Sequence, residues 1–483
     1  MATFKAAGGK PPVPLDEFEA HLANHGDMFI SQADAIRDLR QFAGEADERQ
    51  LAFEAAREGL SSPQRAAVRE GMKSIADALT NAADAADAGE SKEFLVNFEP
   101  DDPAVERAIG RMLMRTIHQF RMPSRKLLLR RAVLLLAVSD FELLIGEVMR
   151  AILLDQSGKA GLSDASISLT ELEQIGNVDE AKRLIVDRKV DDLLRKSMDD
   201  WVTWFERIGV KLKDMPDEWA SFVEIFARRN VVVHAGGRVT EQYLSILRST
   251  GLRNSDLPKL GADLELDDAY LDTSSEHLLS CGVLLVAGTW LQLRKGDSEK
   301  AEGWIVSRTE QLLELEHLRA VRTISGTVLE RSRGRLRRDT ELALRTMSWV
   351  ARRELGDIES VQKEVREWDS SGIDLKYAHA RAVLLNDDDK SVLQIKQLLE
   401  RKSLTSVELV ASPIYRSLIA RRRADLLPDI AAHGQLSIAT SAVKKPNDSD
   451  GTGETTDAPD QASPSDEDPP ADEDPPASQL SRD

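Results

Sequence analysis

The apolar run LLLRRAVLLLAVSDFELLIGEVMRAILL, residues Leu127–Leu154, decides the fold class of this chain. Charged residues interrupt the run, which favours a helix buried in a protein core over a helix that crosses a membrane. A second apolar run, LLSCGVLLVAGTWLQL at Leu278–Leu293, is too short to span a bilayer. Both runs predict buried core helices.

The composition extends this reading to the whole chain. Charged residues make up 30% of the 483 residues and aromatic residues 5%, and strand-like alternation is nearly absent, which together predict an all-α fold. The length suffices for two or three domains. The single cysteine, Cys281, can form no intrachain disulfide, and the first 14 residues lack the apolar segment of a signal peptide. We therefore expect a cytoplasmic protein.

The run Arg229–Gly237, RNVVVHAGG, carries the densest chemistry in the chain. The apolar spacing before it predicts a helix that the two glycines end, because glycine tolerates the left-handed conformation at a C-cap. His234 then lies in the last turn, where the helix dipole favours a protonated imidazole. Asn230 and His234, four residues apart, share a helix face, and Arg229 lies about 100° away. These three groups could surround one phosphate, move a proton and stabilise negative charge.

The same run, with Tyr243 and Leu244 after it, resembles the signature of the HEPN superfamily: an arginine, a polar residue, a few apolar residues and a histidine. Many HEPN proteins are ribonucleases of toxin, abortive-infection and antiviral (anti-phage) systems. Arg229, Asn230 and His234 match the motif position by position, and the preceding Arg228 offers an alternative register for the arginine. The resemblance covers about residues 125–295.

Two further segments are similar to the family's helices. Residues 132–142 resemble its first long helix, on which a small polar and an acidic residue face the motif, here Ser139 and Glu142. Residues 201–209 resemble the helix that precedes the motif. The resemblance implies an all-helical bundle that acts as a homodimer and cleaves RNA without a metal or other cofactor. It also implies that His234 transfers protons and that Arg229 and Asn230 bind the phosphate, with Ser139, Glu142 and Tyr243 in support.

Residues 16–124 are predicted to form an N-terminal helical accessory region, after a disordered segment at 1–15. Residues 107–139 contain eight basic and no acidic residues. This positive island could hold an RNA backbone beside the cleft, or it could be a solvated face or a partner for the acidic tail. The RNA-binding candidates on it are Arg107, Arg111, Arg115, Arg125 and Arg130.

Residues 296–440 are predicted to be a C-terminal helical domain. Helical hairpins are expected near Thr340, Asp374 and Thr405, with turns at Gly356-Asp357 and at 386–389, which resembles either a helix-hairpin repeat or a plain bundle. Such a domain could recruit a partner protein. Residues 441–483 contain twelve acidic and three basic residues and predict a disordered tail, either solubilising or a mimic of RNA.

Other chemistries lack their sequence patterns. There is no phosphate-binding glycine loop, no HExxH and no CxxC motif, and His21 and His25, four residues apart, are interpreted as a surface pair. The favoured function is therefore a metal-independent endoribonuclease. The alternatives are a non-catalytic HEPN-like scaffold that dimerises, and a helical protein unrelated to that superfamily.

Overall fold

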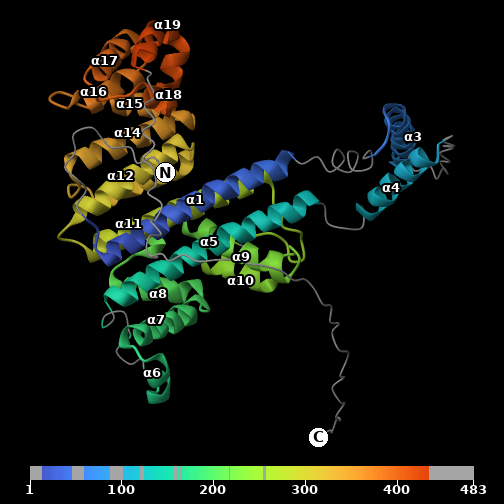
Figure 1. Ribbon diagram of the computed structural model, residues 1–483, viewed down its shortest axis with the longest axis horizontal. Coiled ribbons are helices and arrows are strands. Elements are labelled where there is room, and N and C mark those ends of the chain that lie inside the picture. Colours follow the sequence, from blue (N-terminus) through green and yellow to red (C-terminus); the bar gives the residue numbers. More distant parts are fainter. Residues whose placement is uncertain are drawn as a thin grey trace, which may run out of the picture. The chain divides into compact units, whose positions relative to one another are not determined.

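The computed structural model, shown in Figure 1, describes residues 14–45, 59–87, 102–119, 125–156, 158, 162, 166–216, 218–253 and 257–433. These residues form helices joined by turns and loops, and the β pairing among them is limited to one isolated bridge between Arg238 and Asp263. The predicted all-α fold is confirmed. The predicted disordered segments, 1–15 apart from its last two residues and 441–483, lie outside the described residues.

The centre of the fold is helix α5 (Arg125–Asp155), which carries the longer of the two apolar runs. It packs against α1 (Glu17–Glu45) and α11 (Asp268–Leu293), and Figure 1 shows α1 and α5 running side by side. Phe141 of α5 is fully buried, with its ring edge-on to Phe29 of α1 and to Phe222 and Phe226 of α9 (Trp219–His234). Both apolar runs are thus core helices, as predicted.

A glycine allows this close packing. A Cβ atom at Gly282 of α11 would lie 2.3 Å from Cε1 of Phe29 and 2.9 Å from Cδ2 of Leu144. Any side chain at this position would therefore force the Phe29 and Leu144 side chains to shift. The absence of a side chain at Gly282 is what lets three helices meet at one point.

Helix α11 also bears on the question of a membrane. Among the described residues it is the one helix long and apolar enough to cross a bilayer, and 67% of its most apolar stretch is buried inside the protein. Burial against α1 and α5 accounts for its apolar sequence without a membrane.

The other helices of the region 125–295 pack around α5 and end at recognisable caps. Ser197 caps α8 through a capping box, and Gly209 ends it at φ 86°. Thr240 accepts a hydrogen bond from the Tyr243 amide at the start of α10. These elements are α6 (Leu169–Ile175), α7 (Val178–Leu194), α8 (Met198–Ile208), η1 (Leu212–Asp214), α9 (Trp219–His234) and α10 (Glu241–Ser249).

The predicted N-terminal accessory region, 16–124, is not one unit. Phe18, Leu22 and Ile30 of α1 are buried in the same core as Phe141. Helices α3 (Ser62–Asp87) and α4 (Pro103–Gln119) instead bury a small cluster of their own, which includes Val68 and Ile109. The prediction was wrong here because helical periodicity shows that a face is apolar but not which distant helix covers it.

The C-terminal helical region follows without a break in the core. The three helix pairs predicted near Thr340, Asp374 and Thr405 are present, and Gly356 and Asn386 lie in the turns with positive φ. Their buried residues join the cluster around Phe141, so residue 295 separates no two cores. The elements are α12 (Ser298–Glu314), α13 (Leu318–Arg331), α14 (Arg338–Glu354), α15 (Ile358–Glu367), α16 (Leu375–Leu384), α17 (Asp388–Glu400), α18 (Ser406–Ala411), η3 (Pro413–Tyr415) and α19 (Arg416–His433).

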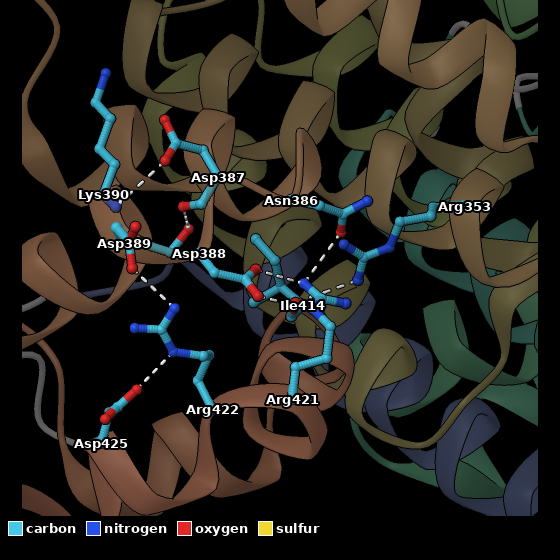
Figure 2. Close-up of polar contacts among 11 residues, drawn as sticks. Arg353, Asn386, Asp387, Asp388, Asp389, Lys390, Ile414, Arg421, Arg422 and Asp425 are labelled. Atoms are coloured by element: carbon cyan, nitrogen blue, oxygen red, sulfur yellow. Dashed lines mark hydrogen bonds and ion pairs between the residues drawn. The ribbon is translucent and has the colours of Figure 1, made fainter.

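Acidic residues at the start of α17 tie that helix to α19. Figure 2 shows Asp387 accepting a hydrogen bond from the Lys390 amide while the next two carboxylates face arginines of α19. Both oxygens of Asp388 accept from Arg421, at 3.0 and 2.7 Å, and Asp389 accepts from Arg422 at 2.8 Å. The triple aspartate is therefore a helix cap and an interhelical contact.

Candidate active site

The RNVVVH run forms the last turn and a half of α9, as predicted. The Ala235 and Gly237 amides both donate to the Val231 carbonyl, at 2.9 and 3.1 Å. Gly236 and Gly237 have φ values of 62° and 95°, which only glycine adopts readily. His234 is consequently the final residue of the helix, at its negatively polarised end.

Arg229 is joined to the acidic residue predicted to face it. Its Nη2 donates to Oε1 of Glu142 on α5, 87 residues away in the chain. Burial raises the pKa of Glu142, and the Arg229 charge opposes that rise. The Arg229 side chain is 24% exposed, while its Nε atom is buried.

Asn230 and His234 lie on the same face of α9 and both are exposed. Ser139 of α5 is exposed as well. Within the described part of the chain, none of these three side chains has a hydrogen-bond partner. The structure thus leaves their polar atoms available, whereas it engages Arg229 and Glu142 with each other.

Arg228, the alternative arginine, has a different environment. It donates to Oε1 of Glu224 at 2.6 Å and to the Glu265 carbonyl at 2.7 Å, and its guanidinium stacks 3.9 Å from the ring centroid of Tyr270. The Tyr243 hydroxyl donates to the same Glu224 oxygen at 2.6 Å. Burial and then the Glu224 charge raise the pKa of Tyr243, so its hydroxyl stays protonated.

These contacts place Arg228 and Tyr243 in a cluster that holds α9 to α10 and α11. Arg229 is the more accessible of the two arginines, with 24% of its side chain exposed against 16% for Arg228. The sequence does contain a signal for the Arg228 cluster, because Glu224 and Arg228 are four residues apart on a helix.

The positive island is only partly free. Arg130 donates to both oxygens of Asp268, at 3.0 and 2.7 Å, so its charge is already paired within the fold. Arg107 and Arg111 are exposed on α4. Those two belong to the helix pair with its own small core. The side chains of Arg115 and Arg125 lie outside the described residues.

Arg131, next to Arg130, belongs to the positive island but was not among its RNA-binding candidates. Its Nη2 donates to the Gly236 carbonyl at 2.6 Å, which brings a cation from α5 to the end of α9. The contact spans 105 residues, and no local pattern signals it. Arg131 therefore joins Arg229, Asn230 and His234 as a group close to this helix end.

The site is an open surface. A cavity of about 700 Å³ lies elsewhere, between η1, α11 and α13, and its lining includes Lys211, Lys295, Arg331 and Arg335 but no residue of α9. The two helices that carry Glu142 and Arg229 also bear exposed apolar side chains, namely Leu136 and Leu143 on α5 and Val233 on α9.

Comparison with protein-family models, with curated proteins and with solved structures finds no match to this chain.

Proposed function

We propose that this protein is a metal-independent endoribonuclease that cleaves RNA through attack of the 2′-hydroxyl on the neighbouring phosphodiester. The observation that carries the proposal is the end of α9, where exposed Asn230 and His234 share a face with the Glu142-paired Arg229. An imidazole at this position can accept or donate a proton, and a guanidinium can bind phosphoryl oxygens in a bidentate manner.

The residues divide the reaction between them. His234 takes the proton from the 2′-hydroxyl or gives one to the departing 5′-oxygen. Arg229 neutralises the charge that develops on the phosphate, and Asn230 orients it. Glu142 positions the Arg229 guanidinium, and the exposed Ser139 hydroxyl lies on the same stretch of α5. The products are a 2′,3′-cyclic phosphate and a 5′-hydroxyl.

The reaction needs both a base and an acid, and one chain supplies a single His234 at this surface. We therefore propose a homodimer in which two copies of the face meet and each contributes a histidine. The exposed Leu136, Leu143 and Val233, at 45%, 44% and 47% exposure, support this partner because apolar residues around a polar site favour burial in an interface.

The Arg229–Glu142 contact also favours the second candidate, a dimeric scaffold without catalysis. A guanidinium already held by a carboxylate can serve to fix α9 on α5 and nothing more. In that case the same apolar face would still bind a second copy, but RNA would remain intact. If the protein is the endoribonuclease proposed here, the family resemblance implies that it acts in a toxin or antiviral system.

The experiment is cleavage of total cellular RNA in EDTA by the full-length protein, at concentrations that span its monomer and dimer. We expect His234→Ala to reduce the rate by about 10²–10⁴-fold, the usual contribution of a general acid or base. His277→Ala, which alters a histidine on α11, is the matched control and should retain the rate. Fragment ends should carry cyclic phosphates.

Equal cleavage by wild type and His234→Ala would assign the activity to another residue or a contaminant. If RNA stays intact at concentrations where the wild type is dimeric, the ribonuclease proposal is contradicted and the dimeric scaffold is the remaining candidate.

A further inference from the structure

Two histidines of α1 and one glutamate of α5 converge at a place that the proposed reaction does not use. His21 and His25 lie one turn apart on α1, and their rings are 4.3 Å apart between centroids. Oε2 of Glu147 lies 3.1 Å from Nε2 of His21 and 3.4 Å from Nε2 of His25. The three side chains are 24%, 26% and 13% exposed, so they are not the plain surface pair that the sequence indicated.

The spacing of these atoms fits a transition metal. The three ligand atoms lie within 4.8 Å of one another. Zinc binds histidine nitrogen and carboxylate oxygen at about 2.0–2.2 Å, so neighbouring ligands of a tetrahedral ion lie about 3.3–3.6 Å apart. The two contacts to Glu147, at 3.1 and 3.4 Å, are close to that edge length. Small side-chain shifts would admit an ion between the three groups.

The surroundings orient the glutamate and leave room for solvent. Arg150 donates to the other oxygen of Glu147, and its own charge is shared with Asp187 through a contact of 2.9 Å. Such outer contacts fix the direction of a metal ligand. A cavity of about 450 Å³ borders His21, and its lining includes Phe18 and Asp179. Solvent can therefore approach the cluster from the His21 side.

A second histidine–carboxylate cluster shows what distinguishes this one. His317 lies 2.6 Å from Glu276 through Nδ1 and 3.4 Å from Asp34 through Nε2. Its two carboxylates sit on opposite ring nitrogens, so no single ion could reach all three groups. At Glu147, by contrast, two imidazoles direct one nitrogen each at the same oxygen.

We propose that His21, His25 and Glu147 form a binding site for a divalent transition metal, with zinc as the best fit, that fastens α1 to α5. Two histidines and a carboxylate are a ligand set that zinc uses when it keeps a position open to water. The site is separate from the proposed active site, because Glu147 and Glu142 are five residues apart on α5 and point about 140° away from each other.

The test is zinc titration of the full-length protein after treatment with a chelator, in competition with a zinc-binding dye. We expect one zinc ion per chain and a rise in Tm with excess zinc. His21→Ala and Glu147→Gln should weaken binding by more than about 100-fold, beyond the 10–100-fold typical of outer contacts, and should lose the rise in Tm. His234→Ala is the matched control and should bind zinc like the wild type.

A second measurement avoids reliance on variants that fail to fold. Cobalt(II) added to the metal-free wild type should give the intense visible absorption of a four- or five-coordinate ion at one equivalent, and zinc should displace it. The proposal is overturned if the wild type binds no stoichiometric zinc, or if well-folded His21→Ala and Glu147→Gln bind it unchanged. The ribonuclease proposal is tested separately, by comparing wild type and His234→Ala in the same EDTA buffer.

Discussion

Glu142 and Glu147 are the same residue type on the same helix, yet the pKa of Glu142 is raised and the pKa of Glu147 is lowered. Glu142 faces α9 and has one charged partner, Arg229, so burial dominates and raises its pKa. Glu147 faces α1 and is contacted by His21, His25 and Arg150, which together hold its pKa at about 2. The number of donors around each carboxylate, and not its depth alone, decides which protonation state the fold favours.

The largest effect on stability should come from Phe141, a buried residue of α5 that contacts both α1 and α9. Phe141 contacts Phe29 of α1 and Phe222 and Phe226 of α9. Phe141→Ala should lower the free energy of unfolding by about 3–5 kcal/mol, because it leaves a cavity under both α1 and α9. Denaturant unfolding followed by circular dichroism measures this. A loss below about 1 kcal/mol would contradict a shared core, and Phe141→Leu should cost clearly less than alanine.

The next largest effect should be on RNA cleavage and should come from Arg229, the partner of Glu142. Arg229→Ala should reduce RNA cleavage by about 10²–10³-fold, the usual cost of removing one group that stabilises transition-state charge. The control is Arg188→Ala, which removes the exposed ion pair between Arg188 and Glu171. It should leave cleavage and stability nearly unchanged. Comparable loss in both variants would mean that the effect of Arg229 is not specific to the site.

The smallest effect should be on stability; it should come from Glu147 and depend on pH. The pKa of Glu147 is lowered from 4.5 to about 2, so its stabilising contribution is present above pH 4.5 and is lost as the pH falls towards 2. With solvent screening we expect a contribution of about 1–2 kcal/mol. Glu147→Gln should therefore lower stability at pH 6 but much less at pH 2.

Glu142 provides the contrast. Its raised pKa means that ionisation on going from low to neutral pH costs stability, so Glu142→Gln should not reproduce the acid-side loss. Unfolding of both variants measured from pH 2 to 7 makes the comparison. Parallel pH profiles for the two variants would show that the two carboxylates do not differ as described.

The local features of this fold could be predicted and the distant pairings could not. The two glycines after His234 marked the end of α9, and Thr405 marked the start of α18, because caps and stops are written in adjacent residues. The engagement of Arg130 by Asp268 spans 138 residues. Helical periodicity is the same whichever helix supplies the partner.

The candidate site divides in the same way. The shared face of Asn230 and His234 follows from a four-residue spacing, and Glu142 was placed opposite Arg229 through the family resemblance. The contact of Arg131 with Gly236 and the approach of Glu147 to the histidine pair depend on how α5 lies against α9 and α1. No local pattern carries that information, so the sequence indicated only an ordinary surface pair at His21 and His25.

Gly282 has a consequence for how this chain can change over evolutionary time. A Cβ atom at this position would lie 2.3 Å from Phe29 and 2.9 Å from Leu144, so a larger residue there requires these side chains to shift or residue 29 to become smaller. Phe29, Leu144 and Gly282, on three different helices, are thus packed together so that a substitution at one of them favours a compensating substitution at another. Among descendants of this chain, positions 29 and 282 should covary, with the sum of their volumes held nearly constant.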